Sequence, residues 1–416
     1  MRLIHVADLH FGKSLHGVNL LESGDQPHWA DEFLKLAAEL RPDAVLIAGD
    51  VYDRGAPAAG AVALLSRMTT ELTELGAAVL IVPGNHDSAR RLAFGRKLLS
   101  RAGLHIAPPL TAPGRLSRVT LGDEHGPVDF WLMPYLFPAL AAEALGTELR
   151  DYDAAVRAVL AAQEIDFSRR NVLIAHQNVT VGGAECERGG SESAVGGVGQ
   201  VEYTAFDGFD YAALGHIHAG YPVGRPAVRY AGSPLCYHFH ETKQAAKGPL
   251  LVELGAKGEA PVVTLLPVAP LHPMRALEGE YAALRESGLL QAGENEYLSV
   301  TLTDRRITPE LSDELHGLCA LRGSLLMELR STFREGGTGG ALSAAALREK
   351  GLAELFAEFC ALRCDGAALS DAELRLLDRA AELAERAELR EAPEEAQIEQ
   401  LLTEARSAVE REGGAS

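Results

Sequence analysis

Residues Val45–Arg54 read VLIAGDVYDR, and the first five of them form an apolar run with no polar face. Such a run is typical of a strand that is buried on both sides of a parallel sheet. Asp50 follows Gly49 directly, so its carboxylate is expected at the carboxyl edge of that sheet, where open α/β folds place their ligands. A carboxylate has two oxygens, and Asp50 could therefore bridge two cations.

The composition limits the class of protein. A chain of 416 residues with 47% hydrophobic and 23% charged residues is expected to be globular and to have two or three domains. It contains no apolar run of membrane-spanning length and no signal-peptide pattern, so we expect a cytoplasmic protein. The net charge of −19 has the wrong sign for holding nucleic acid by charge alone. A polyanionic substrate would need metal ions, a local arginine cluster or a partner.

The cysteines agree with a reducing compartment, because there are five of them, scattered along the chain without a CxxC pair. Cys360 and Cys364 are four residues apart and would share a helix face. They could begin a metal site, but no His or other Cys lies nearby in the sequence, which favours two ordinary buried thiols.

Apolar strands and amphipathic helices alternate along the first part of the chain, which indicates a layered α/β fold. Helices are expected over Trp29–Leu40, Ala58–Leu75, Ala89–Ala102 and Asp153–Ala162. The expected strands are Leu3–Val6, Ala44–Ala48, Ala77–Val82, Asp129–Met133, Val172–Ala175, Tyr211–Leu214, Val228–Ala231, Leu250–Leu254 and Val262–Val268. They predict an α/β protein: a β-sandwich flanked by helices.

The alternation stops near Pro270, so residues 1–270 are interpreted as one domain. Residues 271–334 predict a small α+β module, which would form a second domain. Its expected elements are the strand Tyr297–Leu302, the helix Pro309–Leu321 and the strand Ser324–Leu329.

Residues 335–340 are rich in glycine and are expected to form a flexible linker. Beyond it, residues 341–416 carry apolar stripes at helical spacing and predict a helical C-terminal tail. The first stripe consists of Leu352, Leu355, Phe356, Phe359 and Leu362.

Five of the predicted strands are each followed by side chains that can bind a metal ion. These side chains are Asp8, His10, Asp50, Asn85, His176, His216 and His218. A single histidine after a strand carries little information, because most histidines are ordinary surface or core residues. Because parallel strands end at one edge of a sheet, the whole set is expected to converge in space.

The chemistry of these side chains indicates the class of metal. Carboxylate, amide and imidazole groups without thiolates suit Mn²⁺, Fe²⁺ or Mg²⁺ better than structural zinc. Seven ligands are too many for one ion, so we expect two ions bridged by Asp50, an arrangement typical of phosphoester hydrolysis. One ion would be bound by Asp8, His10, Asp50 and His218. The other would be bound by Asp50, Asn85, His176 and His216.

Five more residues near these motifs are candidates for other roles. His86 follows a ligand and is expected to bind the transition state or to protonate the leaving oxygen. Asp53 either orients a nearby histidine or water, or caps the following turn. Arg54, Arg90 and Arg91 either contact substrate phosphates or are solvated surface residues.

The motifs DLH at Asp8–His10, GDVYDR at Gly49–Arg54, GNHD at Gly84–Asp87 and GHIH at Gly215–His218, with the lone His176, resemble those of the calcineurin-like metallophosphoesterase superfamily. This resemblance covers residues 1–235. Within the superfamily, the order of the motifs and the C-terminal organisation are similar to those of the SbcD family, the bacterial counterparts of the Mre-type double-strand-break nucleases. On this resemblance, residues 271–334 would be a capping domain.

The resemblance implies a Mn²⁺-dependent nuclease that acts in DNA double-strand-break repair and recombination. It implies 3′-to-5′ exonuclease activity on duplex DNA and endonuclease activity on single strands and hairpins. It also implies a homodimer, association with the nucleoid, and a partner of the SbcC type, an SMC-like ATPase. The family's metal-binding and catalytic roles map onto the seven ligands and His86. Archaeal and eukaryotic relatives have a second catalytic histidine where this chain has Asp53, so its contribution to strand selection does not transfer.

Alternatives remain for the tail and for the function. The helices around Gly366 could be a DNA-binding helix-turn-helix, a hairpin that docks on the partner's coiled coil, or a plain helical bundle. Their negative charge disfavours DNA binding, and an amphipathic hairpin on a glycine linker favours docking. A protein phosphatase or nucleotide phosphodiesterase would not need the module and tail, and a non-catalytic scaffold would be expected to lack a ligand or His86.

Overall fold

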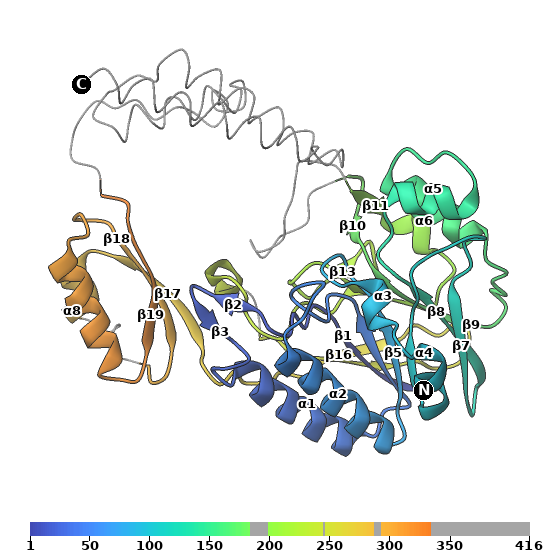
Figure 1. The fold of residues 1–416 in the computed structure, drawn as a ribbon, viewed down its shortest axis with the longest axis horizontal. Helices are drawn as coiled ribbons and strands as arrows, with labels where there is room; N and C mark the ends of the chain where they lie inside the picture. Colours follow the sequence, from blue (N-terminus) through green and yellow to red (C-terminus); the bar gives the residue numbers. More distant parts are fainter. Residues whose placement is uncertain (184–198, 244–245, 287–292, 334–416) are drawn as a thin grey trace, which may run out of the picture. The chain divides into compact units, whose positions relative to one another are not determined.

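The computed structural model describes residues 1–183, 199–243, 246–286 and 293–333. Two six-stranded sheets pack face to face, and helices cover their outer faces (Figure 1). The prediction of an α/β sandwich flanked by helices is therefore confirmed. The linker 335–340 and the tail 341–416 lie outside the described residues, so what was predicted for them stays a prediction.

The first sheet has the strand order β16-β15-β1-β4-β5-β6. Strands β1, β4, β5 and β6 are parallel, and β15 and β16 continue the sheet in antiparallel pairs. Parallel neighbours need a crossover connection, which α1 and α2 provide. The bounds are β1 Arg2–Val6, α1 Asp25–Leu40, β4 Ala44–Ala48, α2 Ala59–Glu74, β5 Ala78–Val82, β6 Leu104–Ile106, β15 Leu250–Glu253 and β16 Val262–Leu265.

The second sheet has the order β13-β14-β12-β9-β8-β7. Strands β8, β9, β12 and β14 are parallel, while β7 and β13 pair antiparallel at the two edges. Helices α5 and α6 connect β8 to β9. The bounds are β7 Ser117–Asp123, β8 Gly126–Met133, α5 Pro138–Leu145, α6 Tyr152–Ala161, β9 Arg170–His176, β12 Tyr211–Gly215, β13 Pro222–Val223 and β14 Arg225–Tyr230.

Three apolar layers hold the sandwich together. Between the sheets, Leu46 of β4 and Ile174 of β9 belong to one cluster of fully buried side chains. Phe33 of α1 packs in the layer outside the first sheet, and Val156 of α6 in the layer outside the second. Because both faces of each sheet are covered, the central strands are apolar throughout, which explains why they were recognisable as continuous runs.

A third sheet of three parallel strands, in the order β17-β18-β19, follows the sandwich in the chain. It has its own core, in which Leu298 of β18 packs with Leu315 of α8. The hydroxyl of Thr308 caps α8 by accepting a hydrogen bond from the backbone N–H of Leu311. The bounds are β17 Met274–Gly279, α7 Tyr281–Glu286, β18 Tyr297–Leu302, α8 Pro309–Ala320 and β19 Leu325–Ser331.

The single helix expected over Ala89–Ala102 is wrong. The segment contains two short helices and a 3₁₀ turn, because Gly95 adopts a left-handed φ of 68° and breaks the helical path. The bounds are α3 Ala89–Leu92, α4 Arg96–Leu99 and η1 Ser100–Ala102, and the remaining short elements are β2 Ser14–Leu15, β3 Val18–Asn19, β10 Asn178–Thr180, β11 Gln200–Glu202, η2 Tyr203–Phe206 and η3 Phe239–Lys243.

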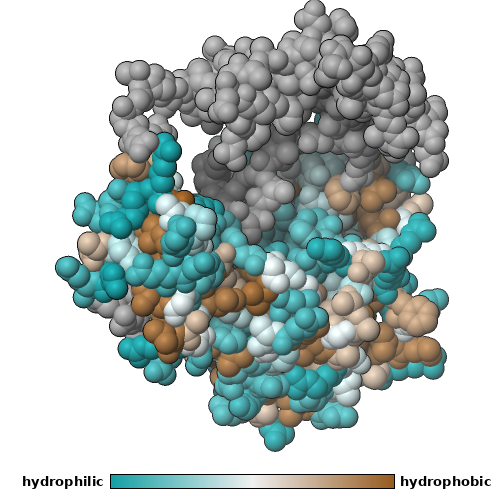
Figure 2. Space-filling view, turned by 60° about the vertical axis from the view of Figure 1, so that its left-hand side comes forward, coloured by the Kyte–Doolittle hydropathy of each residue, from teal (hydrophilic) through white to brown (hydrophobic). Residues whose placement is uncertain are grey.

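The surface shown in Figure 2 is mostly hydrophilic, with hydrophobic patches between the polar residues. Among the described residues, none of the helices combines the length and the apolar character needed to cross a membrane.

Candidate metal centre

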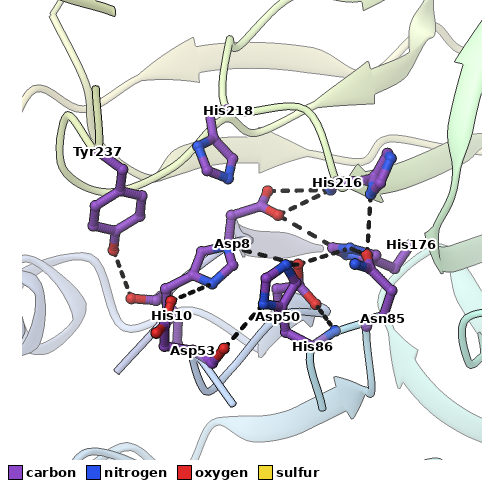
Figure 3. Close-up of polar contacts among 12 residues, drawn as sticks. Asp8, His10, Asp50, Asp53, Asn85, His86, His176, His216, His218 and Tyr237 are labelled. Carbon is purple, nitrogen blue, oxygen red and sulfur yellow. Dashed lines mark hydrogen bonds and ion pairs between the residues drawn. The ribbon is translucent and has the colours of Figure 1, made fainter. Parts of the chain in front are cut away.

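The seven predicted ligands lie at the carboxyl ends of five strands, and these strands belong to two sheets. β1, β4 and β5 of the first sheet precede Asp8, Asp50 and Asn85, and β9 and β12 of the second sheet lead to His176 and His216. Figure 3 shows the side chains pointing toward one another from both sheets. The sequence predicted the convergence but not the division into two sheets, because both consist of parallel apolar strands.

The backbone is strained where the ligands are attached. Asp8, His10, Asp50 and His216 have φ angles of 55°, 43°, 47° and 102°. Residues with a Cβ rarely adopt this left-handed region, at a cost on the order of 1–3 kcal/mol each. Strain at four neighbouring positions indicates that the surrounding fold holds these side chains in place.

Asp50 lies in the middle of the cluster. Its Oδ2 is 3.3 Å from Nε2 of His176 and 3.6 Å from Nε2 of His10. Burial disfavours its charge, but His176, followed by His10 and His86, keeps the pKa of this carboxyl well below its usual value. Asp50 therefore contacts candidate ligands from both predicted groups.

In the first group, Asp8, His10 and His218 have potential ligand atoms within 4.8 Å of one another. His10 is 2% exposed, and neither of its ring nitrogens makes a hydrogen bond within the described residues. Burial lowers the pKa of His10 well below its usual value, so the imidazole is neutral, the form that binds metals. Buried nitrogens without hydrogen bonds are costly, and a cation among these side chains would remove that cost.

In the second group, Nδ1 of His176 donates to the backbone oxygen of Ala48 at 2.8 Å, so that Nε2 faces the centre. The Oδ1 atom of Asn85 lies 3.0 Å from Nε2 of His176 and 3.1 Å from Nδ1 of His216. Burial lowers the pKa of His216 to about 3. Burial also opposes the charge of His176, but Asp50 raises its pKa overall to about 9.

Two glycines before the ligands leave no room for a side chain. A Cβ on Gly84 would lie 2.2 Å from Oδ1 of Asp50, and a Cβ on Gly49 would lie 2.3 Å from Nδ1 of His176. Gly49 also has a φ of +85°. The glycines of the GD and GN pairs therefore allow the loops to approach one another.

His86 borders the cluster and is 43% exposed at its side chain. Its Nδ1 donates to the backbone oxygen of Asp53 at 2.9 Å, and its Nε2 lies 4.0 Å from Oδ2 of Asp50. The side chain of Asp53 accepts from Nζ of Lys13 at 3.0 Å and lies 3.7 Å from Nδ1 of His10. His86 is thus the histidine of the GNHD motif that reaches both the cluster and solvent.

The three candidate arginines lie on the surface. Arg54 is 84% exposed at its side chain and is 3.7 Å from Oδ2 of Asp53. Arg91 donates to the backbone oxygen of Gly55 at 2.8 Å, and Arg90 is exposed on α3. Arg54 and Arg91 are thus placed along the loop that follows Asp50.

Four residues that support the site were not recognised in the sequence. Asp87 accepts hydrogen bonds from the backbone N–H groups of Val51, Tyr52 and Gly84 and so ties two ligand loops together. Its place in GNHD was a signal for this role.

The other three carry no local signal. Gln26 donates to the backbone oxygen of His10 at 2.7 Å, and the hydroxyl of Tyr237 donates to that of Leu9 at 2.6 Å. Glu241 lies 3.2 Å from Nδ1 of His218. Burial opposes its charge, but His218 and Lys247 lower the pKa of Glu241 to about 2. These partners are brought together only by the tertiary fold.

The chemistry of the cluster fits divalent metal ions, since carboxylates, an amide and neutral imidazoles surround buried nitrogens that lack hydrogen bonds. Comparison with known proteins agrees. Residues 1–220 match the calcineurin-like phosphoesterase family, and residues 270–363 match the family described as the type 5 capsule protein repressor C-terminal domain.

Two relatives are named as the SbcD subunit of the nuclease SbcCD. The protein from Staphylococcus saprophyticus subsp. saprophyticus is 33% identical over 293 residues, which is 68% of this chain and 72% of the relative. The protein from Staphylococcus epidermidis is 29% identical over 311 residues, which is 73% of this chain and 79% of the relative. The chain therefore belongs to the calcineurin-like phosphoesterases and, within them, to the SbcD family.

Proposed function

We propose that this chain is the nuclease subunit of an SbcC–SbcD-type complex and hydrolyses DNA phosphodiester bonds with the help of two divalent cations. The observation that carries the proposal is the clustering of three metal-binding groups around Asp50, with His10 buried and without hydrogen bonds within the described residues. The names of the relatives support DNA as the substrate.

In this proposal Asp50 contributes to both ions. The first is also held by Asp8, His10 and His218. The second is also held by Asn85, His176 and His216. Mn²⁺ is the proposed metal, with Mg²⁺ and Fe²⁺ as alternatives of similar ligand preference. Bound cations supply an activated water as nucleophile and neutralise charge on the phosphoryl oxygens.

His86 is proposed to contact the phosphoryl group or the leaving oxygen. Its position supports this role, because the Asp53 carbonyl accepts from Nδ1 and leaves Nε2 directed toward the cluster. In the neutral ring, Nε2 then carries the lone pair, and in the protonated ring it carries a proton to donate. Arg54, Arg90 and Arg91 are proposed to contact the phosphates of the DNA strand outside the cluster.

The finer features of the activity follow the family resemblance and remain proposals. They are 3′-to-5′ exonuclease activity on duplex DNA, endonuclease activity on single strands and hairpins, and a role in double-strand-break repair and recombination at the nucleoid in the cytoplasm. Residues 271–334 are proposed to be a capping domain beside the nuclease domain of residues 1–270.

The proposed partner is an SMC-like ATPase of the SbcC type, bound through residues 341–416. The relatives are named as subunits of a two-component nuclease, which supports such a partner. The chain is also proposed to form a homodimer. Phe94 and Leu98, next to α3 and in α4, are 86% and 70% exposed, and Phe94 borders an apolar cavity of ≈ 550 Å³ between α2 and α3. Large exposed apolar side chains beside such a cavity suit a second copy of the chain.

A cleavage assay tests the proposal. Labelled duplex, hairpin and single-stranded DNA are incubated with the full chain and Mn²⁺, in parallel with a phosphoprotein and a p-nitrophenyl phosphodiester. We expect metal-dependent cleavage of DNA, abolished by a chelator. Hydrolysis of the phosphoprotein without cleavage of DNA would instead identify a protein phosphatase, and activity on neither would support a scaffold.

A further inference from the structure

A buried carboxylate outside the strand-end motifs contacts the ring of His218. Glu241, in η3, is 1% exposed, and its Oε1 lies 3.2 Å from Nδ1 of His218. Its Oε2 lies 2.8 Å from Nζ of Lys247 and 3.2 Å from the backbone nitrogen of Tyr237. The two oxygens therefore have different neighbours, with the imidazole at Oε1 and fixed donors at Oε2.

The backbone of His218 is held by the same segment. Its carbonyl oxygen accepts from Nζ of Lys247 at 2.9 Å and from the backbone N–H of Ser233 at 3.0 Å. Lys247 also donates to the hydroxyl of Ser233 at 2.7 Å. Residues 233–247 thus contact His218 at both its ring and its main chain, although they lie between the two regions matched by known families.

We propose that Glu241 is a positioning residue that fixes the tautomer of His218 for metal binding, an inference that rests on the proposed function. An ionised carboxylate can only accept, so Nδ1 of His218 must carry the proton and donate it to Oε1. In the neutral ring, the lone pair is then on Nε2, the nitrogen available to a cation. Carboxylates that hold a histidine ligand in this way orient the ring and increase its basicity.

Substitution of Glu241 by glutamine tests the tautomer with little change in shape. The ammonium of Lys247 and the backbone N–H of Tyr237 can only donate, so the amide oxygen must take the place of Oε2. The amide NH₂ then faces Nδ1 of His218. A neutral ring can accept this hydrogen bond only if its proton moves to Nε2, where it blocks metal binding.

The experiment compares the wild-type chain, Glu241→Gln and a control, Glu253→Gln, by calorimetric titration with Mn²⁺. Glu253 is an exposed residue of β15, with its side chain 49% accessible and 3.7 Å from Arg2. For Glu241→Gln we expect one of the two equivalents to bind about 10–100-fold more weakly, with no change in the control. In metal-free protein, ¹⁵N NMR of the neutral imidazole should show the proton of His218 on Nδ1 in the wild type and on Nε2 in Glu241→Gln.

Unchanged Mn²⁺ affinity, or the same tautomer in both proteins, would overturn the inference. If Glu241→Gln does not fold, the wild-type spectrum decides, because a proton on Nε2 of neutral His218 contradicts the proposal. Failure of the wild-type chain to bind Mn²⁺ would count against the proposed function. The NMR comparison would still test whether Glu241 sets the tautomer.

Discussion

Nδ1 of His86 lies 2.9 Å from the backbone oxygen of Asp53, and this hydrogen bond turns Nε2 of the imidazole toward the carboxylate of Asp50. The loop that supplies the central carboxylate therefore also orients the exposed histidine beside it. A contact of this kind supports a role for His86 in handling a proton or a phosphoryl oxygen at the edge of the centre.

His86→Gln should keep Mn²⁺ affinity and lose roughly 10²–10⁴-fold in DNA cleavage rate, the usual contribution of a positioned acid–base group. The reason is that His86 borders the cluster without being needed as one of the seven ligands. Calorimetry measures the affinity, and cleavage of a labelled duplex measures the rate. A variant that cuts at nearly the wild-type rate would show that His86 has a structural role only.

The exposed apolar side chain of Phe94 should be required for the homodimer. Phe94→Glu places a charge on a surface where the wild type exposes 86% of a phenyl ring, so burying it against a second copy becomes unfavourable. We expect dimers of the wild type and monomers of the variant by light scattering, with the same circular dichroism. A variant that remains dimeric would place the interface elsewhere.

The pair of Asp123 and Arg170 should stabilise the fold in a pH-dependent manner. Arg170 is 2% exposed and donates to Oδ2 of Asp123 at 3.0 Å, and this contact holds the pKa of Asp123 below its usual value. Asp123→Asn leaves the guanidinium buried without its charge partner. It should lower the free energy of unfolding at pH 7 by roughly 3 kcal/mol.

The sign of the pH effect follows from the lowered pKa. The carboxylate stabilises the fold above its unfolded pKa of about 3.9, and this contribution is lost as the pH falls toward the folded value. In urea unfolding, the difference between wild type and Asp123→Asn should therefore shrink below pH ~4. A difference that stays constant at acid pH would contradict the assignment.

The stripe in the C-terminal tail should be needed for the ATPase partner and not for the chemistry. Phe356→Glu combined with Phe359→Glu replaces two apolar residues of the predicted docking face with charges. We expect the full-length double variant to keep its Mn²⁺ affinity and to lose the partner in a pull-down. Undiminished binding would mean that the partner surface lies elsewhere.

The sequence predicted most of the site because each ligand follows an apolar strand. Asp50 and His176 could be placed in this way, since a buried parallel strand has a recognisable composition and its end defines an edge. The strand β7 was missed, because its residues are half-exposed at a sheet edge and its run SRVTLGD is not continuously apolar. β17 was missed for the same reason, with MRALEG mixing charged and apolar residues.

The supporting contacts could not be predicted, because they join residues far apart in the chain. Tyr237 and Leu9 are separated by 228 positions, and their hydrogen bond depends on how β1 and the segment after β14 come together. Glu241 is only 23 positions from His218, but no periodicity relates a 3₁₀ turn to a strand end. Such contacts are visible only in the folded chain.

The central claim is that the carboxylate of Asp50 bridges two cations, and calorimetric titration of wild type and Asp50→Ala with Mn²⁺ tests it most directly. Two-metal sites of this kind place the ions about 3.5–4 Å apart, so one carboxylate can bind both. The account predicts two bound equivalents in the wild type and a marked weakening of both in Asp50→Ala. A single equivalent in the wild type, or the loss of only one in the variant, would contradict it.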